Sequence, residues 1–470
     1  MKKNKAVIVF FTYLVISLLI GIRFYFKMYS PDSYVQIAAG VDTFLKTAIS
    51  NVRPIQYLIT SLELKVLGYD ANYFTVYRLN ITISLILISL TMTMMYFFIK
   101  KIADINNKAS KILLFFALIL VFYNAFLVDI FAFLENSGMV FSFCTAIIAS
   151  MIFTSKKEMK ARTLLTFMVL LISEFSYQTM VVAFSLFAMV FITIKNNGKI
   201  SLKEIVIINS LAIIPMFLLL GYSKILEMHN VRVLGRFESS EMLLTNLSIV
   251  LMLVLLYSVL YGIYIGLCIV TTKKRKNTEK VKINGFLISL FIALVFNMSF
   301  ALINSGFISL RMAWPVETIP GLCIVYFLCL DKENTKKYKV LLILFAIVEL
   351  AKFICVVQVY DYYKERVETN VNELHSYIES HPEYQINKIS IYEDANITKD
   401  KWFSIVIYLN LVINNRNDDF VYQYKTLVDN SVEEAEPKEE LIEYFKKFDW
   451  NNYDEKQFII EGDTLHFCKY

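Results

Sequence analysis

The chain has 470 residues, of which 57% are hydrophobic, 15% aromatic and only 19% charged. So few polar residues cannot cover the surface of a globule of this length, and the composition therefore excludes an ordinary soluble fold. The formal net charge of +6 does not indicate nucleic-acid binding, because the basic residues lie mostly in short segments between apolar stretches, where they act as topology signals.

Apolar stretches follow one another along the first 360 residues, and a bilayer span needs about 20 such residues. The first stretch follows a basic start, but Arg23, Phe24 and Tyr25 come next instead of a small-residue cleavage site, so we expect an uncleaved span. The chain is therefore predicted to be an α-helical polytopic membrane protein, with about eleven transmembrane helices in residues 1–360. The expected spans are 6–26, 79–99, 112–130, 138–154, 163–180, 181–194, 205–222, 244–270, 283–303, 313–330 and 340–359.

The connecting segments alternate between rich and poor in lysine and arginine. The poor set has no basic residue between Asp129 and Ser137, or between Glu174 and Met180. The positive-inside rule assigns the rich set to the cytoplasm. Eleven spans that start inside then place the N-terminus in the cytoplasm and the C-terminal region outside the cell membrane. The rich segments begin at Lys2, Lys100, Lys156, Lys195, Lys273 and Lys332.

Two long segments are predicted on the outer side. The loop at 27–78 holds two amphipathic stretches, Tyr34–Leu45 and Ile55–Leu67, which we expect to lie along the membrane surface. A second outer loop covers 222–243.

From about Asp361 the composition becomes charged and polar, which predicts a small extracytoplasmic α+β domain over 361–470. A hairpin is expected at 456–468, turning at Glu461-Gly462-Asp463. Cys468 is the one cysteine of this region and a candidate for labelling from outside. The other expected elements are helices at 364–380, 400–412 and 436–447, and strands at 388–392 and 419–424.

Charged side chains at the centre of a membrane helix cost about 2.5–3.5 kcal/mol each, so those in or near the spans indicate function by default. Polar residues also collect wherever helices leave the bilayer, and that would explain any single one. The positive-inside rule does not explain outer carboxylates together with outer arginines. The outer set consists of Asp32, Asp42, Arg53, Asp129, Glu135, Glu174, Arg232, Arg236 and Arg311.

Asp32 lies in Tyr-Ser-Pro-Asp-Ser-Tyr, directly after the first span. It suits either the first turn of a helix that starts at Pro31 or a general base at the membrane surface. Arg53 and Arg311 each precede an apolar stretch. Each could extend toward lipid headgroups or hold a phosphate with its planar fork.

Several further polar residues lie inside the expected spans. Glu174, Tyr177 and Gln178 are spaced i, i+3, i+4, which predicts one polar helix face directed into the bundle or a cavity. Glu349 and Lys352 are i, i+3 and are expected to neutralise each other.

Some functions are disfavoured by the sequence. The four histidines lack metal-ligand spacing, so no metal or other cofactor is indicated. The absence of a phosphate-binding glycine-rich loop with Lys and Ser/Thr disfavours an ATP-driven pump.

The order of these motifs resembles the bacterial Gtr-type glucosyltransferases of the GT-C superfamily, over roughly residues 1–330. The resemblance rests on the outer Asp32 after the first span, Arg53-Pro-Ile-Gln-Tyr-Leu, Ser-Tyr-Gln at 176–178, and Arg311-Met-Ala-Trp-Pro. The chain departs from the family at Val52, where glycine is common, and at Ser33, where a second acidic residue is common. The missing second carboxylate argues against a metal-binding version of the site.

The resemblance implies a glycosyltransferase that moves a hexosyl group, glucosyl in the family, from a polyprenyl-phosphate donor to a polysaccharide or lipid-linked glycan. An outer site has no access to cytoplasmic nucleotide sugars, which also favours this donor. Asp32 is then expected to be the base of an inverting displacement. Arg53, Arg311, Arg232 and Arg236 are expected to bind the donor phosphate, and Asp42, Glu135, Glu174, Tyr177 and Gln178 to line the acceptor site or cavity.

Two alternatives stay open at this point. A polysaccharide polymerase or ligase of the O-antigen type also uses lipid-linked sugars outside the membrane, and the arginines of the 222–243 loop would suit it. A non-enzymatic translocator of lipid-linked glycans would leave the outer carboxylates with a structural role only.

Overall fold

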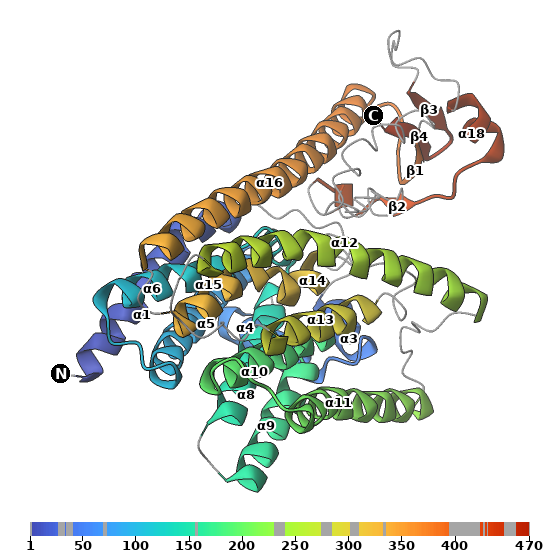
Figure 1. Ribbon diagram of the computed structural model, residues 1–470. Coiled ribbons are helices and arrows are strands. Elements are labelled where there is room, and N and C mark those ends of the chain that lie inside the picture. The colour runs from blue at the N-terminus through green and yellow to red at the C-terminus, as the bar shows by residue number, and fades with distance from the viewer. Residues whose placement is uncertain are drawn as a thin grey trace. The chain divides into compact units, whose positions relative to one another are not determined.

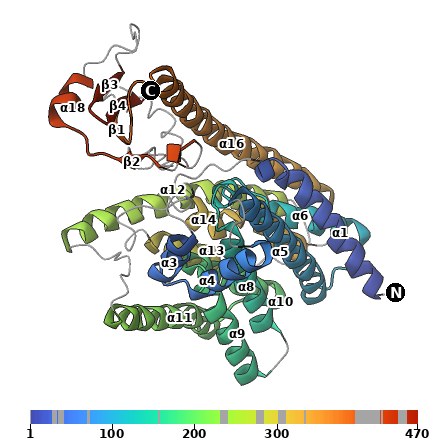
Figure 2. The same ribbon diagram turned by 180° about the vertical axis from the view of Figure 1, so that it is seen from behind.

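The structure is a computed structural model of residues 1–470 (Figure 1), seen from behind in Figure 2. Its contacts divide the chain into two units, which we call the helical unit (Met1–Lys27 and Leu45–Ile354) and the C-terminal unit (Met28–Phe44 and Cys355–Tyr470). The structure describes residues 2–26, 33, 41–68, 73–155, 158–229, 240–273, 284–300, 310–331, 335–393, 424–425, 428–429, 431–445 and 457–469.

Helices make up the described part of the chain up to Ser380. In chain order they are α1 (Lys2–Gly21), η1 (Phe24–Phe26), α3 (Val41–Ser50), α4 (Pro54–Leu67), α5 (Tyr73–Ile102), α6 (Lys108–Phe122), α7 (Leu127–Phe131), α8 (Asn136–Thr154), α9 (Met159–Glu174), η2 (Gln178–Met180), α10 (Val181–Lys195), α11 (Leu202–Met228), α12 (Ser240–Lys273), α13 (Asn284–Ser299), α14 (Leu310–Glu317), α15 (Ile319–Leu330) and α16 (Thr335–Ser380).

Eight helical segments of the described chain are long and apolar enough to cross a membrane, which fits a polytopic helical membrane protein. They lie in α1, α5, α8, η2–α10, α11, α12, α14–α15 and α16, and α13 is a shorter apolar helix. Two other predicted spans correspond to α6 and α9, which have 15 and 16 residues. The count of eleven and the orientation of the chain stay predictions.

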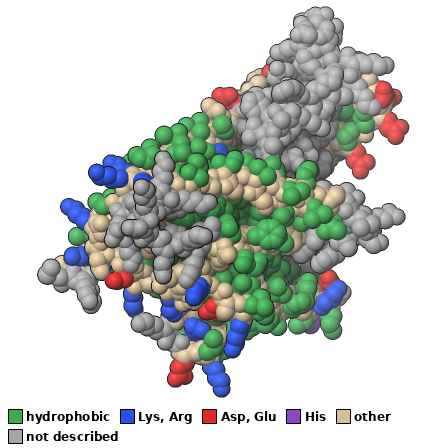
Figure 3. All heavy atoms as spheres, in the orientation of Figure 1, with side chains coloured by type: hydrophobic (Ala, Val, Ile, Leu, Met, Phe, Trp, Pro, Cys, Tyr) green, Lys and Arg blue, Asp and Glu red, His purple; other side chains and the backbone are tan. Residues whose placement is uncertain are grey.

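The centre of the helical unit is formed by α8, α10 and α14–α15, which are buried along most of their length, whereas α1, α11, α12 and α16 expose apolar faces. Figure 3 shows hydrophobic side chains across the helices, with Lys and Arg gathered mainly at the edges. At the centre, Trp314 stacks on Phe143 with ring centroids 3.8 Å apart. Helices α6 and α15 meet at Gly321, where a Cβ would lie 2.6 Å from the backbone nitrogen of Val121.

Side-chain hydrogen bonds join several helix ends on one side of the helical unit. The Tyr77 hydroxyl donates to the carbonyl of Phe131 and the Asn80 amide to that of Leu134, both at 2.7 Å. These contacts join the start of α5 to the segment between α6 and α8. We call this side, where α5 and α8 begin and α9 ends, the polar end. At the far end of α8, Lys195 Nζ donates to the Thr154 carbonyl at 2.8 Å, which joins the end of α10 to the end of α8.

The C-terminal unit contains a four-stranded sheet in the order β2-β1-β4-β3, formed by β1 (Lys388–Glu393), β2 (Glu433–Glu434), β3 (Phe458–Glu461) and β4 (Thr464–Lys469). Strand β1 is parallel to β2 and β4, and β3 and β4 form an antiparallel hairpin. Gly462 adopts φ +64° in its turn, as the predicted Glu-Gly-Asp turn requires.

Both faces of this sheet are covered by a helix. On one face, Val371 and Leu374 of α16 belong to the same core as Ile389 and Phe467. On the other face, Phe445 of α18 (Glu439–Phe445) packs against Tyr392 and Cys468.

Helix 364–380 is not separate from the last span, because α16 runs unbroken through 335–380, a stretch without glycine or proline. Labelling of Cys468 from outside was expected only if this residue is exposed in the fold, and Cys468 is fully buried, so it does not suit that experiment. The predicted helix at 400–412 and residues 419–423 of the predicted strand lie outside the described residues.

Candidate functional site

Three of the predicted site residues meet at the start of α4. Arg53 is the N-cap residue of this helix, Pro54 is its first residue, and only 9% of Arg53 is exposed. The Arg53 Nε donates to Gln178 Oε1 at 3.3 Å, and its guanidinium carbon lies 4.2 Å from the centre of the Tyr177 ring. A hydrogen bond and a cation–π contact therefore hold the orientation of this planar cation.

Gln178 also fixes the turn that precedes α4. Its Nε2 donates to the carbonyl oxygens of Asn51 and Val52, each at 3.1 Å. Val52 adopts φ +60°, a conformation that a β-branched residue rarely takes and that glycine takes readily. The tight turn therefore depends on contacts with a segment more than a hundred residues away.

The predicted shared helix face of Glu174, Tyr177 and Gln178 is wrong. Helix α9 ends at Glu174, Tyr177 has extended backbone angles, and η2 begins at Gln178. The chain must reverse here to join α9 to α10, so these residues are not on one helix. Glu174 is fully buried, and neither of its carboxylate oxygens has a hydrogen-bond partner within the described part of the chain.

A second predicted arginine lies at the polar end. The backbone N–H of Arg311 donates to Asp129 Oδ2 at 2.7 Å, and Arg311 Nη1 lies 3.6 Å from the same oxygen. The guanidinium carbon of Arg311 is 3.8 Å from the centre of the Phe133 ring. Helix α14, which carries Arg311, packs against α7 and η2. The short helix η2 therefore carries Gln178, the partner of Arg53, and also packs against the helix that carries Arg311.

The remaining predicted site residues are placed only in part. Glu135 is half-buried at the N-cap of α8. Asp42 belongs to α3, but its side chain lies outside the described part. Asp32, Arg232 and Arg236 also lie outside the described residues. The expected association of Asp32 with the arginines therefore stays a prediction.

Sequence reasoning missed the inward face of α4, which carries Gln56, Thr60 and Glu63. Ser137 Oγ donates to Glu63 Oε1 at 2.8 Å, and Gln56 Nε2 donates to Thr60 Oγ1 at 3.2 Å. Burial raises the pKa of Glu63 to about 7, against the lowering effect of hydrogen bonds from Ser137 and Asn80. The i, i+4, i+7 spacing of the three polar residues was the signal that could have found this face.

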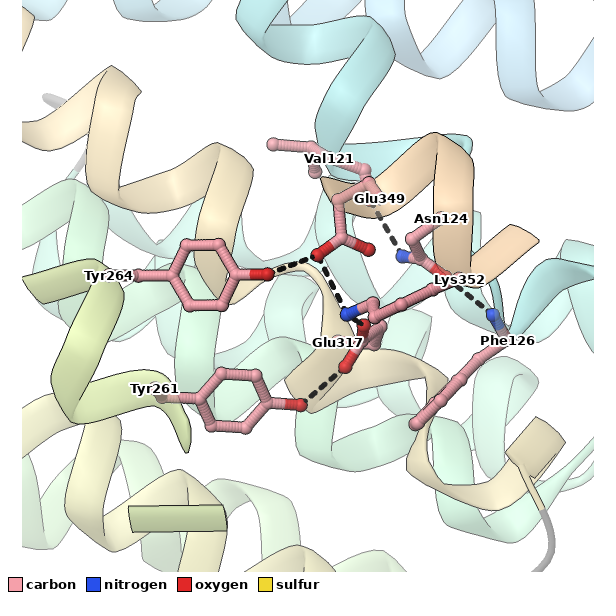
Figure 4. A network of polar contacts seen from close by, with 8 residues as sticks. All are labelled: Val121, Asn124, Phe126, Tyr261, Tyr264, Glu317, Glu349 and Lys352. Carbon is pink, nitrogen blue, oxygen red and sulfur yellow. Dashed lines mark hydrogen bonds and ion pairs between the residues drawn. The ribbon is translucent and has the colours of Figure 1, made fainter. Parts of the chain in front are cut away.

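A buried ionic cluster lies between α12, α14 and α16 of the helical unit (Figure 4). Lys352 forms ion pairs with Glu317 and, at 2.7 Å, with Glu349. The Tyr261 hydroxyl donates to Glu317 at 2.6 Å, and the Tyr264 hydroxyl donates to Glu349 at 2.8 Å. The expectation that Glu349 and Lys352 neutralise each other as a pair was incomplete, because one lysine serves two carboxylates.

This cluster could have been found from two features of the sequence. Glu317 is an acidic residue inside the predicted span at 313–330, where a charge is costly. Tyr257, Tyr261 and Tyr264 are spaced i, i+4, i+7 in the predicted span at 244–270, which predicts one hydroxyl-bearing face.

Comparisons with known proteins identify no relative. No family model matches the chain, and no curated protein or solved structure matches it either. Within the described part, no group of three or more His, Cys, Asp and Glu side chains is placed to hold a metal ion. Independence from a metal stays a prediction.

Proposed function

We propose that this protein is a membrane glycosyltransferase that moves a hexosyl group, glucosyl by its resemblance, from a polyprenyl-phosphate donor to a polysaccharide or lipid-linked glycan. The reaction takes place on the outer face of the membrane. The observation that supports this most is that Arg53 bonds to Gln178 of η2 while η2 also packs against α14, the helix that carries Arg311, although the two arginines are far apart in the chain. Two oriented guanidinium groups suit a phosphate that gains charge as it leaves the sugar.

The contacts of each arginine support the same role. Arg53 is held by Gln178 and Tyr177, and Arg311 by Asp129 and Phe133. Groups that are oriented before the reaction stabilise developing charge without reorganising during it.

The proposed chemistry is a single displacement. An acceptor hydroxyl attacks the anomeric carbon from the face opposite the phosphate, the C–O bond to the phosphate breaks, and the configuration inverts. Asp32 takes the proton of the acceptor hydroxyl, and the lipid phosphate leaves with the electron pair of the broken bond. Arg53 and Arg311 stabilise the leaving phosphate, and Arg232 and Arg236 are further candidates for that role.

The test is transfer of labelled glucose from polyprenyl-phosphate glucose to cell-envelope polysaccharide by the purified protein in lipid nanodiscs. We expect transfer by the wild type and a loss of about ten-fold or more in Arg53→Lys, which keeps the charge but not the planar fork. Absence of transfer by the folded wild type with every polyprenyl-phosphate hexose would refute the proposal.

A deletion strain distinguishes the proposal from its alternatives. Loss of a side-chain sugar from the surface polysaccharide is the result expected of the transferase. Loss of the polysaccharide backbone would indicate a polymerase or ligase. Accumulation of lipid-linked glycan inside the cell would indicate a translocator.

A further inference from the structure

Helix α4 carries a row of polar side chains on its buried face. Gln56, Thr60 and Glu63 are only 3%, 2% and 4% exposed. Arg53 precedes Gln56 by three residues and lies at the head of the same row. With a rise of 1.5 Å per residue, Gln56 and Glu63 lie about 10 Å apart along the helix axis. The row therefore extends away from one of the two proposed phosphate-binding arginines.

The opposite face of α4 is apolar and exposed. Leu58, Leu62 and Val66, spaced i, i+4, i+8, are 53%, 62% and 78% exposed. Such a face suits contact with lipid hydrocarbon, so α4 has the reverse of the arrangement found on a water-soluble protein. A polar row that faces away from lipid is costly unless its groups find partners.

The polar row has hydrogen-bond acceptors that lack donors. Gln56 Oε1, Glu63 Oε2 and, beside them, Asn80 Oδ1 have no hydrogen-bond partner within the described part of the chain. All three are acceptor oxygens when the Glu63 carboxyl is ionised. Buried polar groups with a purely structural role are normally hydrogen-bonded within the protein. Three acceptors without donors therefore indicate a ligand that donates several hydrogen bonds.

Gly138 at the start of α8 makes room for this row. A Cβ on Gly138 would lie 1.3 Å from Gln56 Oε1, so any larger residue would displace the Gln56 side chain. Ser137, the preceding residue, binds the Glu63 carboxylate. The start of α8 thus holds both ends of the row.

We propose that the row Gln56–Thr60–Glu63, with Asn80, binds the hydroxyl groups of the hexosyl group that the donor carries, while Arg53 at its head binds the lipid phosphate. This inference rests on the proposed function and specifies its substrate. Sugar hydroxyls supply the donors that the three acceptor oxygens lack. In its ionised form the carboxylate of Glu63 favours a neutral, hydroxyl-rich hexose and disfavours a uronic acid.

The test is equilibrium binding of three labelled lipids to the protein in nanodiscs: polyprenyl phosphate, polyprenyl-phosphate glucose and polyprenyl-phosphate glucuronate. We expect the wild type to bind the glucose lipid about ten-fold or more tightly than the other two, because hydrogen bonds to a charged group give discrimination of that order. Glu63→Leu and Gln56→Leu should lose this preference and keep their affinity for polyprenyl phosphate.

The matched control is Leu62→Ala, a change on the exposed face of the same helix, which should keep the preference. If Glu63→Leu does not fold, Glu63→Gln keeps the shape of the side chain and should reduce the preference about three-fold or more. Gly138→Ala, which displaces Gln56, should act like Gln56→Leu.

The outcomes separate the two proposals. A wild type that binds no polyprenyl-phosphate lipid contradicts the proposed function itself. A wild type that binds all three lipids equally keeps the donor class but overturns the sugar subsite. A preference for glucose that survives in both leucine variants overturns the assignment of Gln56 and Glu63.

Discussion

Asp129 accepts a 2.7 Å hydrogen bond from the backbone N–H of Arg311 and lies 3.6 Å from the guanidinium of the same residue. One carboxylate thus fixes both the backbone at the start of α14 and the side chain that extends from it. Only 1% of the Asp129 side chain is exposed, against 22% for Arg311, so the acid is the anchor and the arginine keeps access to solvent or ligand.

Asp129→Asn and Asp129→Ala separate these two contacts. The asparagine still accepts from the backbone N–H but loses the charge, whereas alanine loses both contacts. We expect alanine to cost about 3 kcal/mol of stability, as expected when one partner of a buried ion pair is removed, and asparagine to cost less. Thermal inactivation in nanodiscs measures the difference. Equal stability of both variants and the wild type would show that Asp129 does not anchor α14.

Removal of the Lys352 charge should lower the stability of the folded protein more than removal of the Glu349 charge. Lys352→Met leaves Glu317 and Glu349 buried together without a cation, which we expect to cost about 3–5 kcal/mol. Glu349→Gln leaves one carboxylate and one lysine, which form a neutral pair, so it should lower the stability only slightly. The yield of monodisperse protein and its thermal midpoint measure both effects. A Lys352→Met variant as stable as Glu349→Gln would contradict this account.

Glu63 should make stability depend on pH. Its pKa is about 7 in the folded protein and 4.5 ordinarily, so the folded state binds this proton more tightly. The resulting stabilisation is fully present below about pH 4.5 and is lost as the pH rises through about 7. Relative to wild type, Glu63→Gln should therefore gain about 3 kcal/mol between pH 4.5 and pH 8.5, at about 1.4 kcal/mol per pKa unit.

Thermal midpoints of both proteins across this range test that prediction. Leu62→Ala on the same helix controls for general effects of altering α4. A constant difference between Glu63→Gln and wild type at all pH values would place the ionisation of Glu63 outside this window.

Asp32 is predicted to act as the base of the transfer reaction. Asp32→Asn keeps the shape and hydrogen-bonding capacity of the side chain but cannot take a proton, so the rate should fall about 10²–10⁴-fold. A helix-capping role predicts instead a loss of about 1 kcal/mol in stability and little change in rate. Transfer rates at equal amounts of folded protein decide between the two roles. A near wild-type rate of Asp32→Asn would exclude Asp32 as the base and leave Asp42 or Glu135 as the candidate.

The C-terminal unit is predicted to face the outside of the cell. Cys355 is exposed, so the labelling experiment starts from a Cys355→Ser background. Glu440→Cys, at an exposed position of α18, should react with a membrane-impermeant maleimide in intact cells. Asn106→Cys, in a predicted cytoplasmic segment, should react only after lysis. The reverse pattern would invert the topology and exclude an outer site for the arginines.

Local features of the sequence predicted much of the fold. Apolar length and basic segments predicted the main helices, because the cost of burying charge in a bilayer acts residue by residue. Strand β1 and the β3–β4 hairpin followed from local alternation and the Glu-Gly-Asp turn. The face predicted for Tyr177 and Gln178 failed because the chain reverses between α9 and α10, and helical spacing alone does not reveal where a helix stops.

What the sequence determined by itself was the apolar helical character of the chain and a set of arginines and carboxylates near helix ends. Only the tertiary structure decided that Arg53 meets Gln178, that Asp129 meets Arg311, and that Lys352 joins Glu317 to Glu349. The physical reason is that apolar side chains pack equally well against lipid and against neighbouring helices. Hydropathy therefore does not tell which face of a helix turns inward or which helix it contacts. Packing and hydrogen bonding between distant segments make that choice, as the inward polar face of α4 shows.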